Sequence, residues 1–213
     1  MLKKASWVLL GLLLIHTPAS AKIYQWTDEK GGVVFSSEPP PSAAAVSSPA
    51  PADKSRPRSF PLARHGVLIL SVPESWDQEI RLAPEGMPPT IVLTPRDGDE
   101  FEVLITPYWN ANNVPGFNSP KMTKALVGED LKALLPTAVE RDVPIVEIPG
   151  KYGAGHYFLL TDKKPGTGYQ HMVRADIGVG DLLLYVTVLC RTKDSEGLRQ
   201  TLLALQGADH KKD

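Results

Sequence analysis

The chain has 213 residues, with 23 basic and 24 acidic side chains, a formal net charge of −1 and a single cysteine, Cys190. Nucleic-acid binding depends on a basic surface that displaces counterions, so this balance argues against a nucleic-acid partner. One cysteine cannot form an internal disulfide. A chain of this length can bury enough apolar surface to hold itself by packing alone.

Residues 1–21 have the three parts of a secretory signal peptide. Lys3 and Lys4 supply a basic start, an apolar run follows over 7–15, and small residues stand at 19–21. The run is shorter than the ~20 residues that a membrane-spanning helix needs. We therefore expect cleavage after Ala21, a periplasmic or secreted product and no transmembrane anchor after cleavage; an uncleaved anchor is the alternative.

Residues 22–38 predict a β-hairpin, because aromatic and β-branched residues flank a polar turn that ends in two glycines. The segment resembles the module called domain of unknown function 4124, found near the start of many exported bacterial proteins, on the residues Tyr24, Trp26, Asp28, Gly31, Phe35, Ser36 and Pro39. Gly32 is an extra glycine, and Phe35 stands where a tyrosine is common. The resemblance implies an envelope location and a modular role, and it implies no activity.

A lone two-stranded hairpin is marginal in water. This one carries three aromatic side chains, Tyr24, Trp26 and Phe35, within a few residues. We therefore expect these residues to bind, either to the main domain of the same chain or to a partner.

Residues 39–63 predict a linker rich in proline, alanine and serine. Seven prolines fall between Pro39 and Pro61, with almost no large apolar side chain to offset the entropy of ordering. The main domain is then expected at 64–207, followed by a frayed polar tail at 208–213.

The main domain is predicted to be α+β, with an antiparallel sheet and helices packed on its faces. A long central helix is expected to begin at Ser119-Pro120 and end near Leu135, and a C-terminal helix to run from a cap at Asp194 to Gly207. Strand 67–72 is apolar at both parities, which indicates cover on both faces. The predicted strands are 67–72, 79–82, 90–94, 101–109, 145–148, 155–162, 169–177 and 181–191.

The order of these elements is similar to the PsbP-like fold of extrinsic photosystem proteins. Residues 153–162 together with 168–189 also resemble uncharacterised exported proteins. Both are likenesses of architecture, and neither implies an activity.

We find no nucleotide-binding loop, metal signature or nucleophile motif, so we expect no cofactor, no metal and no catalytic residue. If Asp162 faces Tyr169 in a regular hairpin, His156 and His171 share one face of the sheet about 13 Å apart. That separation is too large for one metal ion. His65 and His210 are predicted to be unheld, beside the linker and in the tail.

Cys190 is predicted to be a buried, inert thiol, because it continues an apolar strand. An assembly of Cys190 with His171 and Asp176 would need separate strands to meet, which spacing alone cannot establish.

A loop after strand 101–109 combines aromatic and amide side chains: Tyr108, Trp109, Asn110, Asn112, Asn113 and Phe117. Such residues can form a sugar or peptide surface, with rings for stacking and amides for directed hydrogen bonds. The alternative is a packed asparagine-rich turn. Among these residues, Tyr108, Trp109 and Asn110 are the candidates for binding.

The favoured hypothesis is a noncatalytic binding or assembly module of the bacterial cell envelope, with an envelope protein or a glycan as partner. A hydrolase that uses Cys190 or a histidine is one alternative. A carrier of a small apolar ligand between sheet and helix is another.

Overall fold

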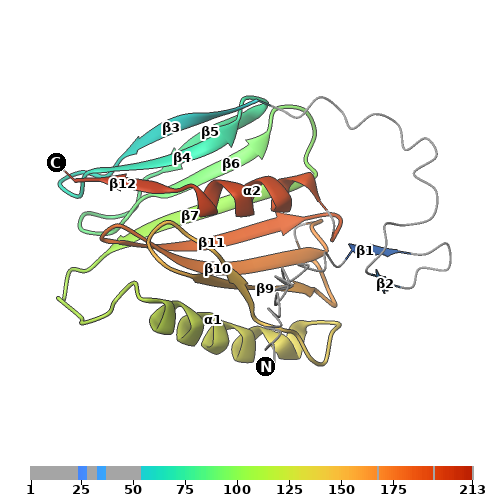
Figure 1. Ribbon diagram of the computed structural model, residues 1–213. Coiled ribbons are helices and arrows are strands. Elements are labelled where there is room, and N and C mark those ends of the chain that lie inside the picture. Colours follow the sequence, from blue (N-terminus) through green and yellow to red (C-terminus); the bar gives the residue numbers. More distant parts are fainter. Residues whose placement is uncertain (1–23, 28–32, 37–53, 167, 194, 213) are drawn as a thin grey trace, which may run out of the picture. The chain divides into compact units, whose positions relative to one another are not determined.

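The computed structural model describes residues 24–27, 33–36, 54–166, 168–193 and 195–212 (Figure 1). The chain divides into two units, Met1–Pro51 and Ala52–Asp213. The predicted signal peptide, the turn of the predicted hairpin and the larger part of the predicted linker lie outside the described residues.

In the first unit, strand β1 (Tyr24–Thr27) pairs antiparallel with β2 (Val33–Ser36). Trp26 lies opposite Val34 in this register. The side chains of Tyr24, Trp26 and Phe35 are outside what the structure describes, so their binding role stays a prediction.

The second unit contains a seven-stranded and a three-stranded sheet. All neighbouring strands pair antiparallel, which confirms the predicted α+β class, but the strands form two sheets where one was predicted. The larger sheet has the order β5 (Trp76–Arg81), β6 (Thr90–Pro95), β7 (Phe101–Trp109), β11 (Leu182–Cys190), β10 (His171–Val179), β9 (Gly155–Thr161) and β8 (Val146–Ile148). The smaller one has the order β12 (Asp209–Lys211), β4 (Val67–Pro73) and β3 (Ser55–Pro61).

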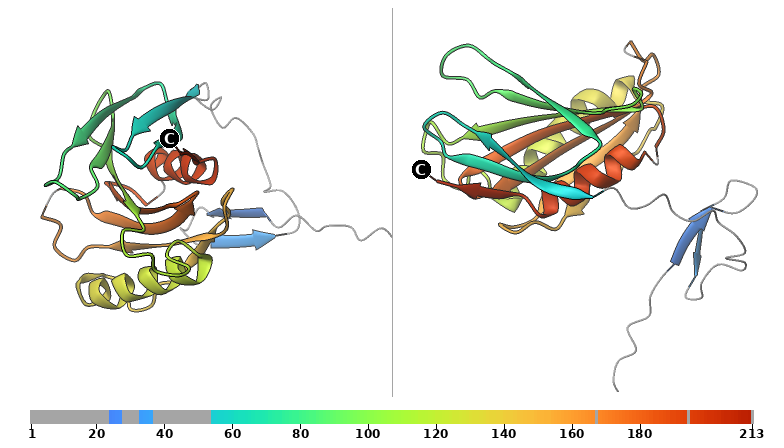
Figure 2. Two further views of the ribbon diagram at one scale, coloured as in Figure 1. Left: turned by 90° about the vertical axis from the view of Figure 1, so that its left-hand side faces the viewer. Right: turned by 90° about the horizontal axis from the view of Figure 1, so that it is seen from above.

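Two α-helices lie on opposite faces of the seven-stranded sheet (Figure 2). Helix α1 (Pro120–Leu134) begins where the Ser119 side chain accepts a hydrogen bond from the amide of Met122, and a short 3₁₀ turn, η1 (Leu135–Thr137), follows it. Helix α2 (Glu196–Gln206) is capped by Ser195, one residue after the predicted cap, which is not described. These serine caps satisfy amides that helix starts leave without partners.

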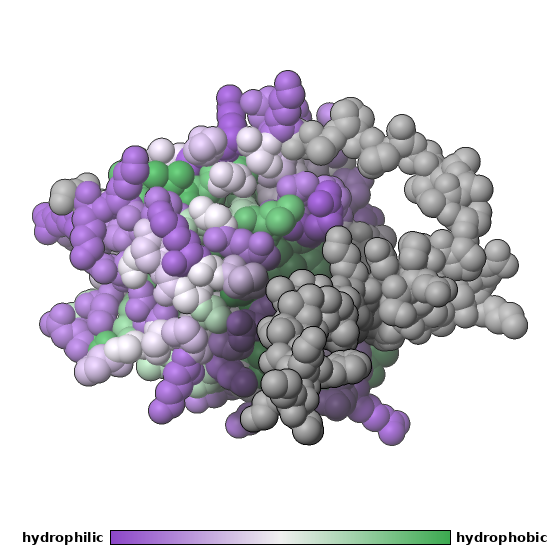
Figure 3. All heavy atoms as spheres, in the orientation of Figure 1, coloured by the Kyte–Doolittle hydropathy of each residue, from purple (hydrophilic) through white to green (hydrophobic). Residues whose placement is uncertain are grey.

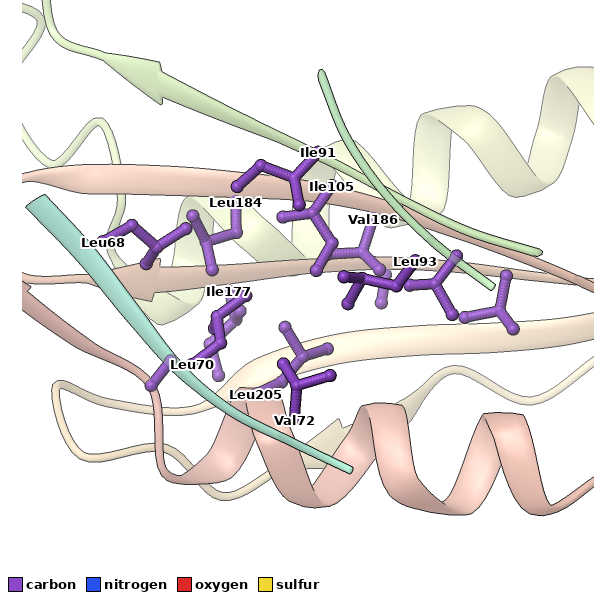
Figure 4. Close-up of a cluster of buried hydrophobic side chains, with 14 of the residues drawn as sticks. Leu68, Leu70, Val72, Ile91, Leu93, Ile105, Ile177, Leu184, Val186 and Leu205 are labelled. Atoms are coloured by element: carbon purple, nitrogen blue, oxygen red, sulfur yellow. The ribbon is translucent and has the colours of Figure 1, made fainter. Parts of the chain in front are cut away.

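The main core lies between the two sheets, with α2 closing part of it (Figure 4). Strand β4 contributes Leu68, Leu70 and Val72, all fully buried, which is the period of two that a strand with one covered face requires. Val67 and Ile69 are only half-buried and Ser71 is exposed, so the predicted cover on both faces of this strand is wrong.

A second, smaller core lies between α1 and the other face of the seven-stranded sheet. Val127 on α1 packs there with Phe158 and Leu160 on β9. These three side chains are fully buried, so the space between helix and sheet is filled at this point.

The predicted linker extends too far. Its last part forms strand β3, and Phe60 and Leu62 are buried in the main core. The proline content made this segment resemble a linker. Pro57 is tolerated in β3 because β3 is an edge strand, and an edge strand does not need every backbone amide as a hydrogen-bond donor.

The predicted frayed tail is also wrong. Ala208 is buried, and β12 pairs with β4 so that Asp209 lies opposite Ile69 and Lys211 opposite Val67. A polar segment can form a strand when its backbone completes a sheet and its side chains face outward.

On the face shown in Figure 3, hydrophilic side chains predominate among the described residues, with smaller hydrophobic areas between them. None of the described helices is long and apolar enough to cross a membrane.

Phe60 tests the corrected boundary of the domain. Phe60→Ala should lower the free energy of unfolding by about 3–5 kcal/mol, because it leaves a cavity in the main core. The neighbouring exposed Ser59→Ala should change it by no more than about 0.5 kcal/mol. Urea unfolding followed by tryptophan fluorescence measures both. An equally small effect of the two variants would show that this segment belongs to the linker and not to the folded domain.

Candidate functional site

Strand β7 ends in Trp109, whose indole stacks on the imidazole of His65. The ring centroids lie 4.0 Å apart and the planes differ by 11°. His65 belongs to the tight turn between β3 and β4, in which its amide donates to the carbonyl of Leu62 at 2.6 Å. The stack therefore joins the ends of the two sheets.

Four clefts share Trp109 as a wall, and we call this region the Trp109 rim. Their volumes are about 510, 220, 680 and 260 Å³. Two of them fall in the range of ~300–1,000 Å³ that is usual for ligand sites. The walls come from the β3–β4 turn, the β5–β6 loop, the β7–α1 loop, the β10–β11 turn and β12.

The largest cleft of the rim is mainly apolar. It is lined in part by Ile80, Leu82 and Met87, whose exposed fractions are 41%, 88% and 57%. Large apolar side chains exposed together beside an aromatic wall are typical of a surface that binds something.

On the polar side of the rim, Asn110 is occupied by its own loop. Its Nδ2 donates to the carbonyl of Val114 at 2.9 Å, and its Oδ1 accepts from the amide of Val114 at 2.8 Å. Asn113 adopts a left-handed φ of 52°, a conformation that asparagine tolerates better than most residues. For these two residues the asparagine-rich turn is the better interpretation.

The three candidates Tyr108, Trp109 and Asn110 thus take different positions. Successive strand residues face opposite sides of a sheet. Trp109 packs against the main core, whereas Tyr108 lies edge-on to Tyr185 on the other side, with ring centroids 6.3 Å apart. All three border the 260 Å³ cleft, but Trp109 alone among them also borders the 680 Å³ one.

His65 and His210, which were predicted to be unheld, are bound to each other. His210 Nε2 donates to the carbonyl of His65 at 2.7 Å, and the amide of Asp181 donates to Nδ1 at 3.3 Å. Because a carbonyl only accepts and an amide only donates, these bonds require neutral His210 with its proton on Nε2. The His210 ring therefore links β12 to the β3–β4 turn and to the β10–β11 turn. Its partner in the first turn is His65, the residue that stacks on Trp109.

Two glycines make room for β12 and its His210 side chain. At Gly66 a Cβ would lie 2.1 Å from the carbonyl oxygen of Lys211, and at Gly180 a Cβ would lie 2.8 Å from Cβ of His210. Both have positive φ, 77° and 57°, which other residues rarely adopt. Glycines in two turns were the available sequence signal, but nothing in the spacing linked them to a histidine near the C-terminus.

A second notable feature is a buried charge cluster beneath α1. The Arg174 side chain is 2% exposed and Asp176 fully buried, and Arg174 Nη2 lies 2.8 Å from Asp176 Oδ1. Arg174 Nε lies 2.7 Å from Asp130 Oδ2, an ion pair too bent to count as a hydrogen bond. The guanidinium also stacks over Tyr185, 3.0 Å from the ring centroid.

Asp176 is the member of this cluster whose buried carboxylate is incompletely hydrogen-bonded. Its Oδ2 has no hydrogen-bond partner within the described residues. Burial raises the pKa of its carboxyl to about 6, although Arg174 opposes the shift. Buried ion pairs of this kind contribute little net stability, because desolvation offsets their attraction.

The predicted register between β9 and β10 is wrong by one residue. His156 lies opposite Asp176, and His171 lies opposite Thr161. His156 and His171 therefore face opposite sides of the sheet instead of sharing one. His156 is buried under α1, where its Nδ1 lies 2.9 Å from Thr123 Oγ1 and burial lowers its pKa. Within the described part of the chain, no group of three or more His, Cys, Asp or Glu residues is placed to hold a metal.

Cys190 is fully buried, as predicted, and burial raises the pKa of its thiol. It lies opposite His171 on the neighbouring strand. Asp176 is five residues from His171 on β10 and so faces the other side. Cys190, His171 and Asp176 therefore do not assemble, and a thiol without solvent access and with a raised pKa is a poor nucleophile.

Comparison with known proteins confirms the resemblance of the N-terminal segment. The family "Domain of unknown function (DUF4124)" matches residues 10–59. No curated protein matches the chain.

Two solved structures are distantly similar in fold. CyanoP, the PsbP of the cyanobacterium Synechocystis sp. PCC 6803, is 6% identical over 78% of this chain and 99% of its own, with a TM-score of 0.45. A protein from Bacteroides thetaiotaomicron VPI-5482 is 12% identical over 68% of this chain, with a TM-score of 0.42. This chain spans 46% of that protein's length. The predicted PsbP-like likeness therefore remains a weak analogy of architecture.

The raised pKa of Asp176 predicts how stability depends on pH. Between its ordinary value of 3.8 and about 6, Asp176 holds a proton in the folded protein that it has released in the unfolded chain, so its contribution to the free energy of unfolding should fall as pH rises through this window. Asp176→Asn cannot titrate and should lose this contribution, so its pH slope should be more positive than that of the wild type. The exposed Asp142→Asn should keep it. Urea unfolding at intervals from pH 4 to 7 measures the slopes, and an unchanged slope in Asp176→Asn would contradict the assignment.

Burial of Cys190 predicts that a soluble thiol reagent modifies the folded protein only as fast as the protein opens. The rate should rise with urea and reach that of a free thiol after unfolding. Rapid modification of the folded protein would show that the thiol is accessible and would reopen the hydrolase alternative.

Proposed function

We propose that this chain is an exported binding protein of the bacterial cell envelope, which holds an envelope protein or a glycan at the Trp109 rim. The observation that carries the proposal is the shared aromatic wall: one indole, fixed by stacking on His65, borders four clefts at the junction of the two sheets. A rigid aromatic side chain gives a large contact area at a low entropic cost.

Location outside the cytoplasm is part of the proposal. It is supported by the predicted signal peptide and by the match of residues 10–59 to a module that resembles those of exported proteins. The proposed role of Tyr24, Trp26 and Phe35 is an additional contact surface in the first unit.

The rim suits a partner that is partly apolar. Ile80, Leu82 and Met87 lie on one side of Trp109, and Asp181 with the asparagine loop lies on the other. An occupant with both an apolar part and hydrogen-bonding groups, such as a peptide segment or a sugar chain, would meet complementary walls.

A small apolar ligand is the second candidate, and the exposed side chains of the 680 Å³ cleft favour it. Its place would be the rim, because Val127, Phe158 and Leu160 fill the space between α1 and the sheet where the carrier was expected to hold it.

Photo-crosslinking in intact cells tests the proposal. A photoreactive residue at Met87, in the rim, should give a specific adduct with an envelope protein or a glycan, and one at Leu203, exposed on α2, should not. Trp109→Ala should lower the adduct yield at Met87 about tenfold or more, as expected for an interface anchor.

Three other results would contradict the proposal, each at a different point. An adduct at Met87 that does not depend on Trp109 would contradict the rim as the site. No adduct above the level at Leu203 would contradict a macromolecular partner. An apolar compound that copurifies with the wild type and not with Trp109→Ala, detected by native mass spectrometry, would favour the small-ligand candidate instead.

A further inference from the structure

The seven-stranded sheet has two edge strands, β5 and β8, and β5 is the longer of the two. Strand β5 ends the strand order and, within the described residues, pairs only with β6. Every residue from Asp77 to Arg81 is exposed, although these positions alternate between the two faces of the sheet. Edge strands of this kind are templates for another strand unless something blocks them.

An apolar row of the main core leads to this edge. The row crosses three strands: Ile91 on β6 lies opposite Ile105 on β7 and opposite Ile80 on β5. The three side chains therefore share one face of the sheet. The first two are 1% exposed, whereas Ile80 is 41% exposed. The row is therefore incomplete at β5.

The free hydrogen-bonding groups of β5 follow from two observed bonds. The amide of Arg96 on the β6 side donates to the carbonyl of Ser75 at 2.9 Å, whereas Arg58 of β3 donates to the carbonyl of Trp76 at 2.7 Å. Because the bonding direction alternates along an antiparallel strand, odd-numbered residues bond to β6 and even-numbered ones point away from it. Arg58 caps one end of the edge, and the backbone groups of Gln78 and Ile80 face outward.

We propose that β5 is the interface through which two copies of this chain form a symmetric dimer by antiparallel strand pairing centred on Ile80. Ile80 then lies opposite Ile80 of the second copy, in a pair that exchanges backbone hydrogen bonds. Glu79 lies opposite Arg81 of the second copy, and the symmetry repeats this contact.

Charge selects this register and this occupant. If the pairing were centred on residue 79, Glu79 would lie opposite Glu79 of the second copy. If it were centred on residue 81, Arg81 would lie opposite Arg81. Like charges directly opposite each other destabilise a sheet. The strand is thus complementary to itself in one register, a property that an unrelated extended peptide has no reason to share.

The ion pairs that Arg81 makes within one copy do not oppose the dimer. Arg81 lies 3.4 Å from Glu79 and 3.2 Å from Glu102, and the Arg81 and Glu79 side chains are about half or more exposed. The Glu102 side chain is only 21% exposed, but the exposed pair between Arg81 and Glu79 is worth little, so exchanging Glu79 of one copy for Glu79 of the other costs little. Pairing covers Ile80 and completes its apolar row.

Sedimentation velocity of the mature full chain over a range of concentrations tests the dimer. The wild type should form dimers. Arg81→Glu should weaken dimerisation about tenfold or more, because two attractive contacts become repulsive. The exchanged pair Glu79→Lys with Arg81→Glu should restore it, because the contacts are attractive again. Asp77→Lys is the matched control, since Asp77 lies beyond the centred pairs, and it should have no effect.

A monomeric wild type at all accessible concentrations would overturn the proposal, as would a dimer that Arg81→Glu leaves unchanged or that the charge exchange does not restore. Thermal unfolding of each variant checks that it is folded. The dimer and the proposed binding site share Ile80, which borders the 680 Å³ cleft, but their tests are distinguishable. Trp109→Ala should dimerise as the wild type does, and loss of crosslinking at the rim would leave the sedimentation result as it is.

Discussion

The second unit depends on one apolar layer between its two sheets. The chain has a single cysteine, which is free and buried, so packing must supply the stability without a disulfide. Leu68, Leu70 and Val72 from the smaller sheet meet Ile105, Leu184 and other side chains of the larger one in this layer (Figure 4). Strand alternation then sends every second residue to the surface or to the second core beneath α1.

The same layer explains where the protein is open. Three strands and α2 cannot cover the whole inner face of seven strands, so the layer reaches only the start of β5, where Trp76 is buried, and leaves the rest of that strand exposed. Ile80 remains exposed there, and Trp109 and His65 close the layer beside it. The Trp109 rim and the free edge of β5 are thus two consequences of one mismatch in area. Both proposed interactions, with a partner at the rim and with a second copy at the edge, would cover apolar surface that the fold leaves uncovered.

Patterns within single segments predicted much of the second unit. Alternation predicted β7 at its observed bounds, and the run of apolar residues placed Cys190 in a buried strand. The errors arose where composition and tertiary pairing disagreed. Phe60 stands among prolines and polar residues, so its strand resembled a linker; His210 stands in a polar tail, yet its ring bonds to His65 across the molecule. The register of β9 and β10 was wrong by one residue, which was enough to move His156 and His171 to opposite faces.

What the sequence alone determined is local: the α+β class, the positions of most strands, the resemblance at the N-terminus and the burial of the one thiol. These follow from periodicity and hydropathy, which act between near neighbours. Only the tertiary structure decided that Trp109 stacks on His65, that Asp176 is buried beside Arg174 and that β5 ends the sheet. Such contacts join residues far apart in the chain, and their geometry depends on strand order and register, which a linear pattern does not contain.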